Sequence, residues 1–310
     1  MIVTVTLNAV IDRILSVPGL RLGKTLKGTV VASIPAGKGV NVSRYLAALD
    51  VPSVVCGFVG RRELARYEES FRDTPITSTL IEVPTPTRIN TTLLSDTKTG
   101  ETHIREEGWP VPAEMKLQLR ELLFELSSAH GPFILSGSLP PDFSPAEFTE
   151  IITGLRERGA FVVVDTSGTA LHSALAGDPD VVTPNEEELS ELVGEQTTSS
   201  LAVVEAARSL LGNSPEIAVK RGRKGGVLVT SEAAWTASLD SQSISAVNAV
   251  GAGDAFLAGY LASREKGERA ERRLASAVAA GTASVLKEII GELDRTDYQA
   301  LLSQVEIRPV

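Results

Sequence analysis

The chain has few of the residues that build metal centres and disulfides. Its 310 residues include one cysteine, Cys56, and three histidines. A single cysteine cannot form an internal disulfide, which fits a reducing compartment, so we expect a cytoplasmic protein. The histidines, at positions 103, 130 and 172, are scattered and predict neither a metal cluster nor a hydrolase triad.

Long apolar runs and an excess of basic charge are also missing. No stretch approaches the roughly 20 apolar residues of a membrane span, and the start, MIVTVTLNAVID, lacks the basic region of a signal peptide. The net charge of −9 argues against nucleic acid or an anionic membrane as a partner. Residues 1–60 differ, because they carry six basic and two acidic side chains. This local excess either serves a small anionic ligand or is chance scatter.

Short apolar runs alternate with helical patterns along most of the chain. Apolar residues three and four apart predict helices, residues 251–303 are mostly helical in pattern, and short apolar runs predict buried strands. This alternation predicts an α/β fold with a mainly parallel central sheet covered by helices on both faces. The predicted strands are 2–7, 53–59, 133–137, 161–165, 180–184, 217–220 and 226–230, and the predicted helices are 39–50, 113–127, 145–158 and 199–211.

Two segments interrupt this alternation. Residues 13–35 and 86–105 carry strand patterns without an intervening helix. The second segment contains TRINTTLLSDTKTGETHI, which predicts a hairpin with its turn at 97–100. We expect the two segments to form a small β-sheet lid that projects from one continuous domain spanning residues 1–310.

The stretch VNAVGAGDAFLAGYLA, residues 247–262, joins a strand-like run to an apolar helix through Gly251, Ala252, Gly253 and Asp254. A helix N-terminus carries unpaired N–H groups and a positive partial charge, and glycines let a ligand approach the backbone closely. The pattern predicts an anion hole for a phosphoryl group, with Asp254 as the base that accepts a proton from an attacking hydroxyl. The alternative is a glycine-permitted turn in which Asp254 caps the helix.

Other phosphate-binding motifs do not fit the sequence. LGKT at 22–25 has Pro18 where a Walker loop needs its first glycine, and AGKGVN has Gly39 directly after the lysine. Phe256 occupies the third glycine position of the dinucleotide fingerprint. The glycine turn before Asp254 is therefore the phosphate-binding candidate that the sequence offers.

Seven motifs in a fixed order give the chain a resemblance to a known family. They are TLNAVID (6–12), AGKGVNVSRYLAALD (36–50), TRINTTL (87–93), LSGSLPP (135–141), VVTPNEEEL (181–189), GRKGG (222–226) and VGAGDAFLAGY (250–260). Over nearly its whole length the chain resembles the PfkB branch of the ribokinase-like carbohydrate kinases. Within that branch it looks most like the kinases of fructose 1-phosphate and tagatose 6-phosphate. The resemblance implies a three-layer α/β/α ribokinase-like fold with a β-sheet lid.

The resemblance also implies an activity. We expect ATP-dependent conversion of fructose 1-phosphate to fructose 1,6-bisphosphate, with Mg²⁺ as cofactor. Tagatose 6-phosphate and fructose 6-phosphate are alternative acceptors, because kinases of all three share these motifs. A catalytically silent relative that binds sugar phosphate as a regulator is another alternative, and the retention of Asp254, Asn185 and Glu188 speaks against it. Lys38 and Arg88 disfavour a nucleoside or vitamin kinase.

Site residues are carried over by motif match. Asp254 is the implied base, and Gly251, Ala252 and Gly253 form the implied anion hole. Asn185 and Glu188 are implied to position Mg²⁺, a hard ion that binds few carboxylates directly, although a capped helix start explains NEEE equally well. The implied substrate residues are Asp12, Lys24, Gly37, Lys38, Gly39, Asn41, Arg88, Asn90, Ser136, Gly137 and Ser138. The implied nucleotide residues are Asn185, Lys220, Gly222, Lys224, Gly225, Ala280 and Gly281.

Departures from the family pattern raise further expectations. Thr183 stands where many relatives carry lysine, so we expect Lys220 or Lys224 to replace a contact with ATP. Asn248 and Ala249 replace the usual serine or threonine, so the sequence neither predicts nor excludes a monovalent-cation site. A small sheet with exposed faces is poorly covered in a monomer. Since relatives often pair their lids, we expect a homodimer through the lid.

Overall fold

The structure is a computed structural model that describes residues 1–95, 101–212, 214–240 and 244–310. Its main sheet has ten strands: β1 (Ile2–Thr6), β4 (Ser53–Gly60), β5 (Ile76–Val83), β8 (Phe133–Ser136), β9 (Val162–Asp165), β10 (Val181–Val182), β11 (Glu216–Lys220), β12 (Gly226–Thr230), β13 (Ala234–Ser238) and β14 (Glu306–Pro309). Their spatial order is β14-β13-β12-β11-β10-β9-β8-β1-β4-β5. The pairs from β5 to β11 are parallel, and β12, β13 and β14 extend the sheet in antiparallel fashion. The predicted mainly parallel sheet is confirmed.

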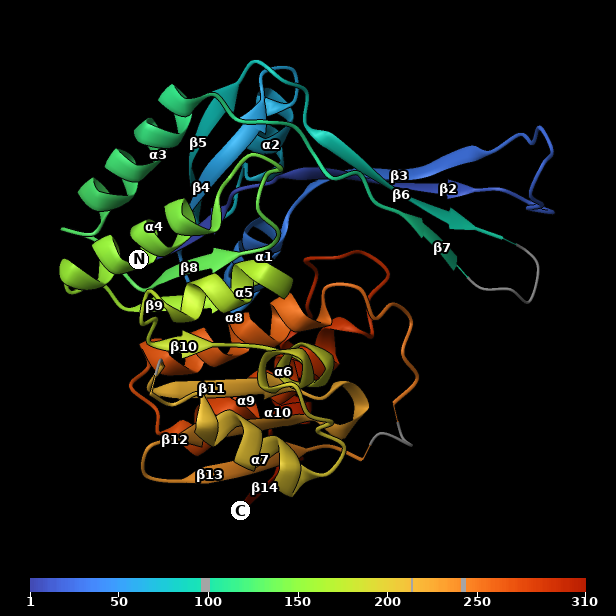
Figure 1. Cartoon of the computed structure of the whole chain (residues 1–310). Coiled ribbons are helices and arrows are strands. Elements are labelled where there is room, and N and C mark those ends of the chain that lie inside the picture. Colours follow the sequence, from blue (N-terminus) through green and yellow to red (C-terminus); the bar gives the residue numbers. More distant parts are fainter. Residues whose placement is uncertain (96–100, 213, 241–243) are drawn as a thin grey trace.

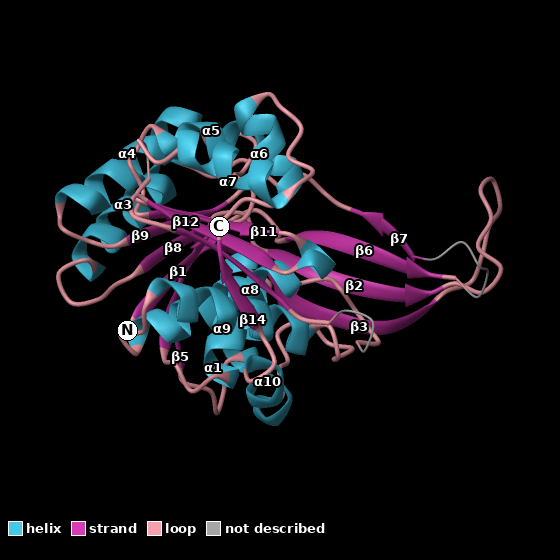
Figure 2. Cartoon of the chain, turned by 90° about the horizontal axis from the view of Figure 1, so that it is seen from below, coloured by secondary structure: helices cyan, strands magenta, loops and turns pink. Residues whose placement is uncertain are grey.

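Helices cover both faces of this sheet, which is why its central strands are apolar on both sides (Figure 2). One face carries α3 (Ala113–Leu126), α4 (Pro145–Glu157), α5 (Gly168–Leu175), α6 (Glu186–Val193) and α7 (Ser200–Ser209). The other carries α1 (Lys38–Ala48), α8 (Ala252–Glu265), α9 (Ala270–Ser284) and α10 (Arg295–Leu302). The helix α2 (Leu64–Ser70) joins α1 in a small apolar cluster around Tyr67.

Each face of the sheet has its own apolar core, and alternation along a strand assigns side chains to one core or the other. In β9, Val162 and Val164 belong to the core under α3, α4 and α5, whereas Val163 belongs to the core under α1, α8 and α9. Strand side chains alternate with period two. The next residue on the Val163 face is Asp165, so the strand directs that carboxylate toward the side of α1 and α8.

A second sheet of four strands projects from the body (Figure 1). It consists of β2 (Val10–Ser16), β3 (Thr29–Ala36), β6 (Arg88–Leu94) and β7 (Glu101–Ile104), in the order β3-β2-β6-β7. The antiparallel pairing of β6 with β7 confirms the predicted hairpin, whose expected turn at 97–100 lies outside the described residues. β2 starts three residues before the expected lid boundary at 13, because it follows β1 almost directly. We call this four-stranded sheet the lid.

The described part of the chain contains no helix that is both long enough and apolar enough to cross a membrane. The C-terminal helices α8 and α9 pack against each other instead, and their apolar side chains belong to the core on the α1 face of the main sheet. This packing accounts for the mostly helical pattern predicted over residues 251–303.

Candidate active site

A cleft of about 1360 Å³ lies between the lid and the edge of the main sheet at which its parallel strands end. Ligands of open α/β sheets bind at that edge. Many of the residues singled out in the sequence line this cleft together. They are Asp12, Gly37, Lys38, Asn41, Arg88, Asn90, Gly137, Ser138, Asn185, Glu188, Lys220, Gly222, Gly251, Gly253 and Asp254.

The start of α8 has a backbone conformation that favours glycine. Gly251 is the N-cap with φ of 85°, and a Cβ atom at this position would lie 2.8 Å from Ile290 and 2.9 Å from the Tyr45 hydroxyl. Both backbone strain and lack of space therefore exclude a side chain. Gly251 and Gly253 line the cleft, so the first turn of α8 faces it with its main chain. Unpaired N–H groups at such a helix start attract anions.

Asp254 lies in the first turn of α8 and is directed to the cleft rather than to its own helix start. Its side chain is buried, and Oδ2 accepts a hydrogen bond of 2.9 Å from Nδ2 of Asn41. The helix start has no side-chain capping hydrogen bond, so the capping alternative has no support here. Burial raises the pKa of Asp254 to about 7, with a contribution from Asp165, while Lys38 opposes the rise. A carboxyl with a pKa near neutrality is suited to accept a proton.

Asp165 ties two lysines to the floor of the cleft. Its carboxylate is 1% exposed and pairs with Nζ of Lys38 at 3.1 Å and with Nζ of Lys220. Thr183 Oγ1 donates a hydrogen bond of 3.0 Å to Oδ1 of the same carboxylate. Burial alone would raise the pKa of Asp165, but Lys220 and Lys38 hold it well below its ordinary value. The pKa of Lys38 is raised, chiefly by Asp165.

The lid supplies a polar and basic half of the cleft. Asp12 of β2 and Asn90 of β6 are direct neighbours in the parallel register of the two strands. Burial raises the pKa of Asp12, while Asn90, Arg88, Arg105 and Arg44 lower it. Arg44 and Arg105 also line the cleft. An anionic ligand would therefore meet three arginines around one carboxylate in this half.

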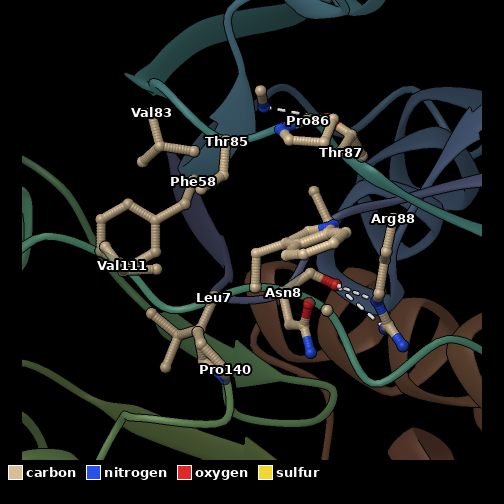
Figure 3. Close-up of a pocket in the computed structure, with 14 residues that line it drawn as sticks. Leu7, Asn8, Phe58, Val83, Thr85, Pro86, Thr87, Arg88, Val111 and Pro140 are labelled. Atoms are coloured by element: carbon tan, nitrogen blue, oxygen red, sulfur yellow. Dashed lines mark hydrogen bonds between the residues drawn. The ribbon is translucent and has the colours of Figure 1, made fainter.

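Arg88 connects the lid with two neighbouring segments. Its Nη2 donates to the main-chain oxygen of Asn8 at 3.0 Å, and its Nη1 donates to that of Glu106 at 2.7 Å. Figure 3 shows this guanidinium beside the Asn8 carbonyl, next to a small pocket. That pocket has a volume of about 30 Å³, which accommodates no more than about one water. Arg88 thus holds the lid in place, and only part of its donor set is left for a ligand.

Asn185 and Glu188 form a reciprocal capping box at the start of α6. Oδ1 of Asn185 accepts from N–H of Glu188 at 2.8 Å, and Oε2 of Glu188 accepts from N–H of Asn185 at 2.8 Å. The structural explanation of NEEE is therefore correct, but both residues also line the cleft. The described residues contain no group of three or more metal-ligating side chains. One carboxylate beside phosphate groups and waters still fits Mg²⁺, so Glu188 Oε1 is the atom suited to face such an ion.

Several predicted residues lie behind or away from the cleft surface. Gly39 packs on Thr6, Ser136 contacts Asp165, and Ala252 follows Gly251 in α8. Lys24, by contrast, is exposed in the segment between β2 and β3. That connecting segment forms the far end of the lid (Figure 1). Four nucleotide-side candidates are also absent from the lining.

All four make contacts outside the cleft lining. Lys224 forms an ion pair with Glu186 at 3.0 Å. Ala280 is fully buried between α9 and α8, and Gly281 packs against Ala252. A fourth, Gly225, sits against Ala237 of β13 with φ of 85°. The motif match implies a place near the nucleotide for these residues, and their side chains or backbone also serve packing and pairing.

Asp165 was missed in the sequence because its strand, FVVVD, ends like any buried strand that meets solvent. The available signal was position, since a charged residue at the carboxyl end of a parallel strand lies at the edge where ligands bind. Arg44 and Arg105 were also missed. Arg44 was noted only as one of the six basic residues in 1–60, and no motif contained Arg105.

The α/β/α body, the small lid and the phosphate-suited cleft define the class of the carbohydrate kinases. Within that class the pfkB family of carbohydrate kinases matches residues 3–293. The chain belongs to the pfkB family and is an ATP-dependent sugar kinase.

Named relatives agree with this assignment. The 1-phosphofructokinase of Bacillus subtilis is 32% identical over 310 residues, covering 99% of both chains. That of Haemophilus influenzae is 30% identical over 307 residues, covering 99% of this chain and 97% of the relative. The structure of Escherichia coli phosphofructokinase-2 in complex with substrates and products has a TM-score of 0.89 at 26% identity, covering 97% of this chain and 98% of that one.

Proposed function

We propose that this kinase transfers the γ-phosphoryl group of ATP to fructose 1-phosphate and forms fructose 1,6-bisphosphate. The observation that supports it most is the placement of Asp254, a buried carboxyl at a helix start that faces the cleft and has a pKa near neutrality. The arginine-rich lid half suits an acceptor that already carries a phosphate. The names of the two curated relatives favour fructose 1-phosphate as that acceptor.

In the proposed reaction, Asp254 accepts the proton of the acceptor hydroxyl as its oxygen forms a bond to the γ-phosphorus. The bond from that phosphorus to the bridging oxygen breaks, and ADP leaves with the electron pair. The N–H groups that follow Gly251 stabilise the charge on the transferring group. The ammonium groups of Lys38 and Lys220 lie close enough to Asp254 to lower its pKa, and they stabilise the same charge.

The two substrates occupy opposite halves of the cleft in this proposal. Asp12, Asn90 and Asn41 bind sugar hydroxyls, and Arg88 with Ser138 faces the phosphate of the acceptor. Gly222 and Lys220 lie on the nucleotide side. Asn185 and Glu188 would hold Mg²⁺, which supplies neutralisation of the ATP phosphates when it is bound.

A coupled assay with Mg-ATP and three acceptors tests the proposal. We expect the highest kcat/KM with fructose 1-phosphate and lower values with fructose 6-phosphate and tagatose 6-phosphate. Fructose 6-phosphate is the second candidate, because E. coli phosphofructokinase-2 has been solved with it. Assays with and without K⁺ address a monovalent cation, since the same relative has been solved with potassium. Binding of sugar phosphate without turnover of ATP would identify a regulator instead.

The role of Asp254 is tested with Asp254→Asn, which retains the shape and can still pair with Asn41. We expect kcat to fall at least about 100-fold, the scale of positioned proton transfer. In the unmodified enzyme kcat/KM should fall as pH drops through about 7, because the base becomes protonated. Near-normal turnover by a folded variant would remove Asp254 from the mechanism.

The same variant has an opposite effect on stability. Because the folded-state pKa is raised from 3.8 to about 7, the native enzyme holds this proton more tightly and loses stability as pH rises through that range. Asp254→Asn removes this loss. Relative to the unmodified enzyme it should therefore gain on the order of 2 kcal/mol between pH 5 and pH 8, measured by urea unfolding.

Arg88→Ala tests the acceptor side of the cleft. We expect a higher KM for the sugar phosphate, a loss of about 10- to 150-fold in kcat/KM, and little change in the KM for ATP. Arg88→Lys should rescue only part, because an ammonium has a single nitrogen and cannot reproduce the planar fork whose two nitrogens reach Asn8 and Glu106. The exposed Arg61, which pairs with Glu82, provides a control in Arg61→Ala. A change under about threefold, or a loss of ATP affinity alone, contradicts this assignment.

We also propose a homodimer formed through the lid. Val30 and Val31 of β3 and Ile104 of β7 are each more than half exposed, because no described helix covers the lid. Val31 and Ile104 lie on the face of the lid that lines the cleft. Burying them against a second copy is favourable. Light scattering at micromolar concentration should give twice the chain mass of 32.8 kDa. A mass of one chain overturns the dimer, and four chains would correspond to the tetrameric form in which E. coli phosphofructokinase-2 has been solved.

A further inference from the structure

The end of β9 carries a buried carboxylate to which several neighbouring elements contribute partners. Asp165 accepts hydrogen bonds from Thr183, which follows β10, and from Ser136 at the end of β8, at 3.0 Å and 3.5 Å. It also pairs with Lys38 at the start of α1 and with Lys220 at the end of β11. Each oxygen therefore has one hydroxyl donor and one ammonium donor.

We propose that Asp165 is a positioning residue for phosphoryl transfer, because it fixes the ammonium groups of Lys38 and Lys220 on the floor of the cleft opposite the start of α8. This inference rests on the proposed kinase reaction. Lys220 reaches the α8 start directly, since its Nζ lies 3.8 Å from the position that a Cβ of Gly253 would occupy. Lys38 and Lys220 both act on the charge of Asp254. Asp165 does not itself contact the reacting atoms in this proposal.

The need for such an anchor follows from the charges. Two lysines converge on one small area, and without the carboxylate their ammonium groups would repel each other and turn toward solvent. With Asp165 and Asp254 ionised, the two lysines are balanced by two carboxylates. Both ammonium groups are then held in place before substrates arrive, and no reorganisation is needed when charge moves to the transferring group.

This arrangement separates effects on kcat from effects on KM. Neutralising Asp165 adds one net positive charge to the floor, which favours binding of the anionic substrates. It also releases the ammonium groups from the positions at which they stabilise the transition state. An interaction that is stronger in the transition state than in the ground state changes kcat more than KM. We therefore expect the loss to appear in kcat.

The test is Asp165→Asn in the full-length enzyme. We expect kcat to fall about 10- to 100-fold, with the KM values for ATP and sugar phosphate unchanged or lower. In the pH profile of kcat/KM, the fall on the acid side (the acid limb) should also move to lower pH, since loss of the Asp165 charge lowers the pKa of Asp254. The charged and titratable groups that act on Asp254 are Lys38 and Tyr45 of α1, Asp165 of β9 and Lys220 of β11.

Asp180→Asn is the matched control. Asp180 is also buried and precedes β10, so it lies at the opposite end of the strands, where it pairs with Arg156 at 2.7 Å and accepts from the N–H of Val162 at 2.7 Å. Its variant should lose stability and retain both kcat and the acid limb. If Asp165→Asn does not fold, Thr183→Val removes one bond to Asp165 while keeping the charge. It should then lower kcat about threefold or more at unchanged KM.

Three results would overturn the proposal. Unchanged kcat in folded Asp165→Asn or in Thr183→Val would leave the carboxylate a purely structural role. A raised requirement for Mg²⁺, or a raised KM for ATP at unchanged kcat, would make Asp165 part of ground-state metal or nucleotide binding. An equal loss of kcat in Asp180→Asn would indicate a general effect on folding. Failure of the proposed function is distinct, because the unmodified enzyme would then phosphorylate none of the three acceptors.

Discussion

Asp165 pairs with Lys38 and Lys220 on the floor of the cleft beside Asp254, and this pairing is the constraint on which the site depends. Asp165 and Asp254 are 1% and 5% exposed, and an unpaired charge so deeply buried would cost roughly several kcal/mol. Lys38 and Lys220 reduce that cost only if β9, β11, α1 and α8 all bring their termini to one place. A parallel sheet meets this condition, because its strands end and the following helices begin at the same edge.

The lid is built into the same junction. β2 begins at Val10, four residues after β1 ends at Thr6, and β3 ends at Ala36, two residues before α1 begins at Lys38. The hydroxyl of Tyr67 lies 2.7 Å from the Val10 oxygen and 2.8 Å from the Ala36 oxygen, so one buried side chain fixes both ends of the insertion. The lid residues that line the cleft are thereby held at a defined position relative to the floor.

Features that a short stretch of sequence determines could be predicted, whereas features that depend on contacts between distant residues could not. The central strands were predictable because burial on both faces makes them continuous apolar runs, as in FVVVD. β5, with its alternating ITSTLIEV, and β14, with the polar EIRP, were not expected, because edge strands lack that signal. Most of the predicted residues that line the cleft were identified by motif match. Motifs could not show that Ala280 packs inside the core, or that Asp165 shares a strand face with Val163.

Thr183 and Lys220 show how two departures from the family pattern become one feature in three dimensions. They are 37 residues apart in sequence, yet Oγ1 of Thr183 and Nζ of Lys220 both contact Oδ1 of Asp165. A lysine at 183 would bring a third ammonium group to a carboxylate that already pairs with Lys38 and Lys220. Lys224, the other lysine of this region, pairs with Glu186. The ammonium group at this point of the cleft floor therefore comes from β11, and the short hydroxyl at 183 leaves room for it.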